Sequence, residues 1–310
     1  MAKRLVTGGT GMVGTAINAD LKIGKKDCNL CDWNEVNAFF EKHKPEEVIH
    51  TAAKVGGVWA NMHQKGDFFR ENILMNTFII DAARLHGVKK LVAFLSTCVF
   101  PDKVEYPLNS EKIHLGPPHH SNDAYAYAKR MVDVQLRAYR EQYGLEYVSV
   151  IPTNIYGPHD LFDLENGHVV PTLIHRCFLA RDKGEDMQVW GTGKPLREFI
   201  FSEDVAKLSE WALENYNGIE PLIFSTSEEH SIKELVEMIV ELLQFKGKLI
   251  WLSDKPDGQF RKPSDNTRIK ELHPEFRFTP LYEGLKKTVA WFEANYPNVR
   301  NLQALKSTRI

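Results

Sequence analysis

The sequence predicts an α/β protein with a doubly wound parallel sheet and a smaller, discontinuous α/β lobe. Three observations support this: apolar runs alternate with helical patterns as far as Pro152, a glycine-rich turn follows the first apolar run, and the pattern loosens after Pro152. Strands that are apolar without polar alternation are typical of parallel sheets buried on both faces. A chain of 310 residues also exceeds what one core usually fills, so two lobes are expected.

Predicted strands cover residues 3–7, 47–53, 90–96, 147–152, the start of 197–216, and 248–252. Predicted helices cover residues 12–20, 68–86, 122–142, about 170–182, the later part of 197–216, 231–245 and 281–296. The second strand is expected to be short and to lie around 25–29. The helix at 68–86 is expected to bury a stripe at Phe69, Ile73, Asn76 or Thr77, and Ile80. Ser202 before Glu203 and Asp204 predicts a helix start.

These elements divide the chain into two predicted lobes. Residues 1–155 with about 196–222 are expected to form a Rossmann-type dinucleotide-binding domain. Residues about 156–195 and 223–310 are expected to form the substrate domain.

Composition excludes several classes of protein. Hydrophobic residues make up 43% and charged residues 26% of the chain, which is ordinary for a folded enzyme. The net charge of -2 argues against a nucleic-acid-binding protein, and no apolar run reaches the roughly 20 residues of a membrane span. Four cysteines do not make a disulfide framework, so a cytoplasmic location is expected. Cys28 and Cys31 lack the further ligands of a zinc site, so no metal is expected.

The glycine-rich turn Gly8–Gly14 predicts a dinucleotide site. Its first glycine allows a tight turn, its second lets a pyrophosphate approach the backbone, and its third packs a helix close to the sheet. The cofactor is left open by spacing alone. Asp27 would suit the ribose of NAD, whereas Lys25 or Lys26 would suit the 2′-phosphate of NADP.

A Tyr-x-x-x-Lys sequence at Tyr125 and Lys129 predicts a catalytic pair. On a helix these two side chains share one face, and the lysine ammonium is expected to lower the pKa of the phenol. Ser96 lies at the carboxyl end of a parallel strand, where ligands of such sheets bind, and can hydrogen-bond the same substrate oxygen. Tyr127 is expected to point off this face and to serve in packing.

The glycine turn, Ser96, Tyr125 and Lys129 resemble the extended short-chain dehydrogenase/reductases that act on nucleotide sugars. Within that branch the chain resembles the GDP-L-fucose synthase family nearly end to end, in segments 50–57, 96–101, 152–160, 167–171, 189–199 and 255–262. That family converts GDP-4-keto-6-deoxy-D-mannose to GDP-L-fucose by epimerising C3 and C5 and then reducing the C4 ketone with NADPH. The resemblance also implies a homodimer through the helices at 68–86 and 122–142.

The resemblance assigns catalytic roles. It implies that Cys98 is the base and His168 the acid of epimerisation, and that Tyr125 protonates O4 during reduction. Ser96 supports Tyr125 at that oxygen, and Lys129 also holds the nicotinamide ribose.

The resemblance implies contacts to NADP from residues along the first lobe. They are Gly8, Gly9, Thr10, Gly11, Met12, Val13, Gly14, Lys25, Leu30, Ala52, Ala53, Lys54, Phe94, Leu95, Ser96, Thr97, Tyr125, Lys129, Pro152, Thr153, Asn154, Ile155 and His168. Lys25 falls where bacterial members place a cation for the 2′-phosphate, which favours NADP. The chain is shorter than those members here and has Thr10 where they carry arginine.

The resemblance also implies a GDP-sugar site with cations for the diphosphate and an aromatic face. Its residues are Arg176, Trp190, Arg197, Lys248 and Lys262. Two alternatives remain. One is another nucleotide-sugar epimerase or dehydratase, although a dehydratase would need an acid where Cys98 stands. The other is a non-catalytic dinucleotide-binding regulator, although Ser96, Tyr125 and Lys129 are all present.

Overall fold

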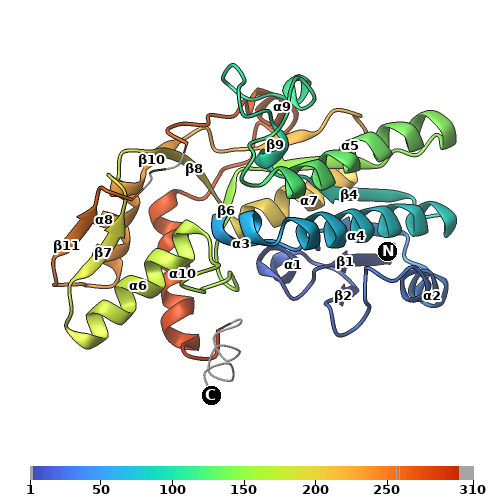
Figure 1. Cartoon of the computed structure of the whole chain (residues 1–310). Helices are drawn as coiled ribbons and strands as arrows, with labels where there is room; N and C mark the ends of the chain where they lie inside the picture. Colours follow the sequence, from blue (N-terminus) through green and yellow to red (C-terminus); the bar gives the residue numbers. More distant parts are fainter. Residues whose placement is uncertain (1–2, 256, 258, 300–310) are drawn as a thin grey trace.

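The computed structural model describes residues 3–255, 257 and 259–299. Residues 1–2 and 300–310 of the predicted lobes lie outside this range. Figure 1 shows a central sheet with its helices on one side of the molecule and a second group of helices and strands on the other.

The central sheet has six parallel strands, as the sequence predicts, in the order β2-β1-β3-β4-β5-β9. They are β1 (Arg4–Thr7), β2 (Leu21–Ile23), β3 (Glu47–His50), β4 (Lys90–Phe94), β5 (Val148–Pro152) and β9 (Leu222–Phe224). The strand order reverses beside β1, and that is where a doubly wound sheet binds its ligand.

Helices cover both faces of this sheet (Figure 1). One face carries α2 (Trp33–His43), α4 (Lys65–Leu85) and α5 (Asp123–Tyr143), and the other carries α1 (Met12–Ala16), α7 (Ser202–Asn215) and α9 (Thr267–Leu272). Successive strand residues alternate between the two apolar layers: Leu5 packs in the first and Val6 in the second, and neither is exposed. This explains why the strands read as unbroken apolar runs.

A second region packs around its own apolar cluster. Its helices are α6 (Val169–Lys183), α8 (Ile232–Leu242) and α10 (Leu281–Asn295), and its strands are β7 (Met187–Trp190) with β11 (Leu249–Leu252), and β6 (Asn154–Tyr156) with β8 (Leu196–Phe201) and β10 (Glu229–Ser231). Short helices lie in the loops after two central strands: α3 (Val58–His63) follows β3, and η1 (Thr97–Val99) and η2 (Ser110–Lys112) follow β4. The predicted boundary near residue 222 falls inside β9, and α9 beyond it also packs on that strand.

Local signals explain where several helices begin. The Asp32 carboxylate accepts hydrogen bonds from the backbone at the start of α2, and Ser231 with Glu234 forms a capping box at the start of α8. Such caps satisfy amides that have no partner within the helix. None of the described helices is long and apolar enough to cross a membrane.

The predicted position of the second strand is wrong. β2 spans Leu21–Ile23 rather than 25–29, because this run pairs with β1 through Leu5↔Leu21 and Thr7↔Ile23. The predicted segment begins instead in a turn, in which Asp27 Oδ2 accepts a hydrogen bond from the Gly24 amide at 2.8 Å. The first helix is also shorter than predicted and ends at Ala16.

The buried face of α4 and the start of α7 also differ from the sequence prediction. The buried stripe of α4 contains Phe68, which is 2% exposed, whereas the predicted Phe69 is 43% exposed. Asn76 lies on the buried face, as predicted, and so does Asn72, which the predicted stripe did not include. At α7, Ser202 is the first helical residue and its side chain forms no cap; Asp204 is buried and accepts hydrogen bonds from Thr279.

Candidate active site

Loops that follow β1, β3, β4 and β5 meet at one edge of the central sheet. In the first loop, Gly8 has φ +70°, and a Cβ there would lie 2.8 Å from the Ala52 amide nitrogen. A Cβ at Gly14 would collide with the Gly8 carbonyl. Only glycine fits these two positions. The loop therefore presents backbone amides without side chains beside β1, where the strand order reverses, and a pyrophosphate can approach them closely.

The nicotinamide end of a dinucleotide fits the end of β5. Thr153 is 7% exposed, and its hydroxyl has no hydrogen-bond partner among the described residues. A buried hydroxyl without a partner is costly, so a polar ligand group at this place would satisfy it. The following Asn154 donates instead to the Glu198 carbonyl at 2.8 Å.

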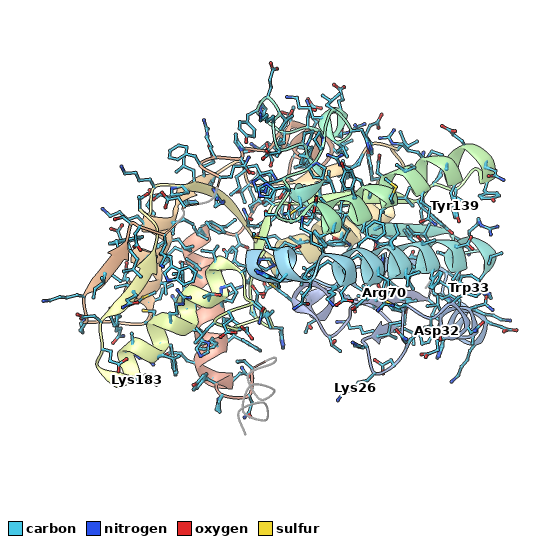
Figure 2. All side chains as sticks on the ribbon, in the orientation of Figure 1. Lys26, Asp32, Trp33, Arg70, Tyr139 and Lys183 are labelled. Atoms are coloured by element: carbon cyan, nitrogen blue, oxygen red, sulfur yellow. The ribbon has the colours of Figure 1, made fainter. Side chains whose placement is uncertain are left out.

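At the adenosine end, the alternative contact residues Asp27, Lys25 and Lys26 are all exposed. The Asp27 carboxylate is engaged by the Gly24 amide, as described above. Lys25 and Lys26 are both exposed, and Figure 2 shows Lys26 projecting away from the body of the protein. The two lysines are therefore available for a cationic contact of the kind that NADP requires. The predicted cofactor residue Lys54 directs its ammonium to Glu71 of α4, at 2.8 Å.

Ser96, Tyr125 and Lys129 meet at the carboxyl end of β4. The Ser96 hydroxyl hydrogen-bonds to Tyr125 and opposes the effect of burial, which raises the pKa of that phenol. Lys129 is buried and donates to the Phe94 carbonyl at 2.8 Å. Burial lowers the pKa of Lys129 to about 8.

The prediction that Lys129 lowers the pKa of Tyr125 is therefore wrong for this structure, because burial dominates and the ammonium is held by a carbonyl. Tyr127 points off the catalytic face, as predicted, but it is 41% exposed rather than packed. The Arg130 guanidinium lies 5.4 Å from its ring centre.

Cys98 lies in the short helix η1 that follows Ser96. Its amide donates to the Ser96 hydroxyl at 3.3 Å, and its thiol sulfur accepts a hydrogen bond from the Asn122 side-chain amide at 2.9 Å. Electrostatic interaction with Cys98 also contributes to the raised pKa of Tyr125, so the two groups share one site. The sequence interpretation missed Asn122, although it directly precedes α5.

His168 is exposed at the start of α6. The loop before it is organised by the buried Asp163 carboxylate, which accepts hydrogen bonds from the amides of Glu165 and Asn166, both at 2.8 Å. The Gly57 amide donates to the Asn166 carbonyl at 2.9 Å. The loop of His168 therefore lies against the loop that follows β3, which neighbours β4 in the sheet.

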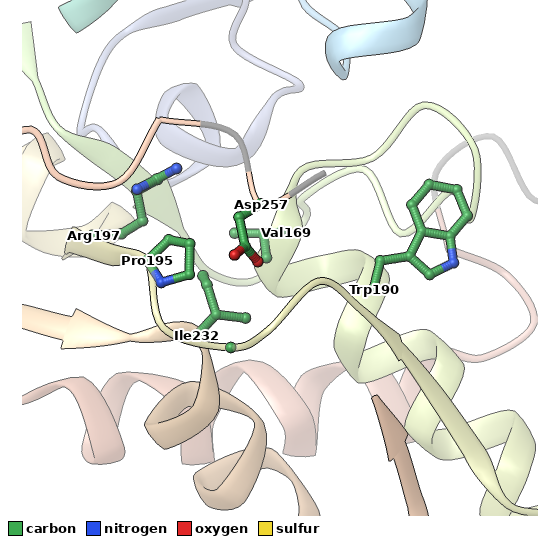
Figure 3. A pocket seen from close by; sticks show the side chains of 7 residues that line it. Val169, Trp190, Pro195, Arg197, Ile232 and Asp257 are labelled. Atoms are coloured by element: carbon green, nitrogen blue, oxygen red, sulfur yellow. The ribbon is translucent and has the colours of Figure 1, made fainter. Parts of the chain in front are cut away.

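A pocket of about 200 Å³ lies in the second region (Figure 3). In Figure 3, Asp257, Val169 and Pro195 lie between Arg197 and Trp190. The residues that line the pocket are Val169, Trp190, Gly193, Pro195, Arg197, Ile232 and Asp257.

Three of the five predicted substrate residues gather here. Arg197 and Trp190 line the pocket, and the Arg176 guanidinium lies 4.9 Å from the Trp190 ring centre. The sequence interpretation missed Asp257, which accepts hydrogen bonds from the Thr192 amide and hydroxyl at 2.6 and 2.7 Å. Its segment was part of the resemblance, so the residue was within reach of sequence reasoning.

The two predicted substrate lysines lie elsewhere. Lys262 donates to the Thr97 carbonyl at 2.8 Å and thus belongs beside Cys98. Lys248 lies at the opposite end of β11 from the pocket, because Leu252, not Leu249, pairs with Trp190 in the parallel register. The prediction that Lys248 contacts the substrate is not supported by this geometry. Among the described residues, no group of three or more histidine, cysteine or acidic side chains could hold a metal.

A glycine cradle, a half-buried tyrosine and a buried lysine at the same sheet edge, and a separate pocket define the class of enzymes that act on a substrate beside a bound dinucleotide. Residues 4–225 match the family described as the NAD dependent epimerase/dehydratase family. The chain is 48% identical to GDP-L-fucose synthase of Dictyostelium discoideum over 96% of this chain and 97% of that protein. It is 33% identical to GDP-L-fucose synthase of Escherichia coli, over 95% and 98%.

Among solved structures, the chain resembles a GDP-L-fucose synthetase of Naegleria fowleri bound to NADP. The TM-score is 0.92 at 44% identity, covering 97% of this chain and 95% of that one. The chain therefore belongs to the NAD dependent epimerase/dehydratase family, in the branch of the GDP-L-fucose synthases. This membership makes it an enzyme of the nucleotide-sugar epimerase and reductase class.

Proposed function

We propose that the chain converts GDP-4-keto-6-deoxy-D-mannose to GDP-L-fucose, by epimerisation at C3 and C5 and reduction at C4. The cofactor is NADP, in agreement with the NADP-bound relative from Naegleria fowleri. The observation that carries the proposal is the thiol of Cys98 beside Ser96 and Tyr125, at the edge of the sheet that holds the glycine cradle. A base at this place suits proton abstraction next to a carbonyl rather than elimination of water.

Epimerisation requires one group to remove a proton and a second to supply one from the opposite face. The protons on C3 and C5 are acidic because they lie next to the C4 ketone, and their removal puts negative charge on O4. Ser96 and Tyr125 hydrogen-bond that oxygen as the charge develops. Cys98 is the base, and His168, on the facing loop, is the acid.

Reduction uses the same oxygen contacts. NADPH, when bound, supplies the hydride for C4. Tyr125 donates the proton to O4, a role that suits a phenol whose pKa is raised by burial, because it stays protonated. Lys129 holds the nicotinamide ribose and orders the end of β4 through the Phe94 carbonyl.

The test is product analysis with GDP-4-keto-6-deoxymannose and either NADPH or NADH, in ²H₂O to record exchange at C3 and C5. We expect GDP-fucose with deuterium at both carbons, formed faster with NADPH. Cys98→Ser and His168→Gln are expected to lose epimerisation while retaining cofactor binding, and Cys31→Ser is the matched control. GDP-rhamnose as the sole product would refute the roles of Cys98 and His168. The absence of any reaction would favour a regulator.

The proposed assembly is a homodimer through α4 and α5, which pack side by side (Figure 1). These helices expose large apolar side chains, including Phe69, Met131 and Val134, at 43%, 37% and 44%. A second copy would cover them. The mass in solution tests this: a dimer that Val134→Asp dissociates is expected, and a monomeric wild type would contradict it. A cytoplasmic location is part of the proposal and is tested by fractionation of the source cells.

A further inference from the structure

Donors from separate parts of the chain surround the turn that carries Cys98. The Asn122 side-chain amide donates to the sulfur itself at 2.9 Å. Lys262 donates to the carbonyl of the preceding Thr97 at 2.8 Å. Arg130 donates to the carbonyl of the following Val99 at 2.5 Å. The thiol therefore sits in a turn that is held on both sides by buried or part-buried cations.

Asn122 is the residue on which this arrangement depends. It is the N-cap of α5, a position where an asparagine side-chain oxygen normally accepts a hydrogen bond from the first helical turn. Here the side chain forms no such cap, and its oxygen is buried without a partner among the described residues. The amide has its N–H, not its oxygen, directed at sulfur. This orientation suits a thiolate, because a charged sulfur is a much better acceptor than a thiol.

We infer that Asn122 is a positioning residue that stabilises Cys98 as a thiolate, and that Lys262 supports it by fixing the turn and adding positive charge. The inference deepens the proposed function, since it rests on Cys98 acting as the base, and a base must lose its own proton before it can take one from the substrate. It is a property of the thiol that can be measured without any sugar substrate.

The charges around the sulfur have known signs. Lys262 is half-buried beside the thiol and carries a positive charge that favours the thiolate. Desolvation lowers the pKa of Lys262, and the interaction with Cys98 opposes that shift. Arg130 adds a second cation through the next carbonyl. Tyr125, from α5, is neutral because burial raises its pKa. Asp102, in the loop after η1, interacts electrostatically with Lys262, and its negative charge disfavours a thiolate at Cys98. The His119 Nε2 atom lies 3.9 Å from the Asp102 carboxylate.

The experiment measures alkylation of Cys98 by iodoacetamide between pH 5.5 and 9.5, with peptide mass spectrometry to separate the four cysteines. Only the thiolate reacts. The variants are Asn122→Ala, which removes the donor, and Asn122→Asp, which has the same shape but replaces the donor with a carboxylate oxygen and adds a negative charge. Both are expected to move the midpoint of Cys98 alkylation up by about one pH unit, a tenfold loss of thiolate near neutral pH. Cys31, which is also part-exposed, is the internal reference and is expected to keep its profile.

Asn122→Ala tests the loss of the donor alone, whereas Asn122→Asp removes the donor, adds a negative charge beside the sulfur and keeps a residue that can start the helix. Aspartate is as good an N-cap as asparagine, so a residue that only starts α5 would tolerate it. An unchanged Cys98 midpoint in Asn122→Asp, with or without a shift in Asn122→Ala, would overturn the inference. Thermal unfolding and NADPH binding of each variant verify that the fold is retained.

The two proposals can fail separately. If Cys98→Ser still forms GDP-fucose while Asn122→Asp shifts the alkylation profile, the thiolate is stabilised but is not the base. If Cys98→Ser stops epimerisation and Asn122→Asp leaves the alkylation profile unchanged, the proposed function survives and the role of Asn122 does not.

Discussion

His50, at the end of β3, makes the stability of the protein depend on pH. It has no exposed surface, and its ring nitrogens hydrogen-bond with Thr7 Oγ1 at 2.6 Å and Asn76 Oδ1 at 3.0 Å. Burial, with a smaller contribution from the positive charge of Lys129, lowers the pKa of His50 from 6.5 to about 3. The folded protein therefore keeps this ring neutral at pH values where the unfolded chain protonates it.

The sign and size of the effect follow from this difference. A histidine whose pKa is depressed by folding contributes stability above its unfolded value of 6.5, and that contribution is lost as the pH falls toward the folded value. Between pH 7.5 and 5.0 the loss covers about 1.5 pH units at about 1.36 kcal/mol each, or about 2 kcal/mol. The His50→Gln variant cannot titrate, so its free energy of unfolding should fall about 2 kcal/mol less over the same interval.

Urea unfolding at pH 7.5 and 5.0 measures both proteins. At pH 7.5 the variant is expected to be less stable than the wild type by about 1–3 kcal/mol, because the replacement disturbs two buried hydrogen bonds. His120→Gln, at an exposed histidine, is the matched control and should keep the wild-type difference between the two pH values. If wild type and His50→Gln lose the same free energy on acidification, His50 is not the neutral buried group described here.

Three further outcomes are expected. Gly14→Ala should weaken NADPH binding at least tenfold in a fluorescence titration, because the added Cβ would displace the backbone of the pyrophosphate turn; unchanged affinity would contradict the cradle. Asp163→Ala should slow deuterium exchange at C3 and C5 about tenfold or more without changing NADPH affinity, because it releases the loop that carries His168, and a normal exchange rate would show that the loop needs no such support. Asp257→Ala should raise the KM for the GDP-sugar more than it lowers kcat, because Asp257 lines the pocket and holds the Thr192 turn; an equal KM would remove Asp257 from the substrate site.

Much of the fold can be read along the chain. The central strands carry apolar residues at consecutive positions, such as Leu5 and Val6 in β1 and Leu91, Val92 and Ala93 in β4, so their burial on both faces and their parallel pairing follow from local pattern. The position of the second strand cannot be predicted in this way. Leu21–Ile23 is too short to show an apolar pattern, and only its pairing with β1 identifies it as a strand. The start of the buried stripe of α4 was assigned wrongly because a polar residue lies on the buried face. Asn72 is buried, and its side-chain amide donates to the carbonyls of Lys54 and of Phe68 in the preceding turn of the helix.

Some residues of the candidate site can likewise be predicted from the sequence, and others cannot. The Tyr125–Lys129 pair and the glycine turn depend on spacing within one element, and spacing reveals them. Lys248 was placed at the substrate by the resemblance to the family, but the register of β11 against β7 puts it at the end of β11 that is far from the pocket. Asn122 has no distinguishing neighbour in the sequence, and only the approach of η1 to the start of α5 gives it a partner.

The amino-acid order alone therefore determined the architecture, the dinucleotide cradle and the family, because each is encoded in periodicity or in residues a few positions apart. The tertiary structure decided the charges and contacts of the reactive groups: burial keeps Tyr125 protonated, and contacts from distant segments place Lys262 and Asn122 around Cys98. The reason is physical. Desolvation and hydrogen bonding between remote segments depend on what packs around a group, and that environment exists only once the chain has folded.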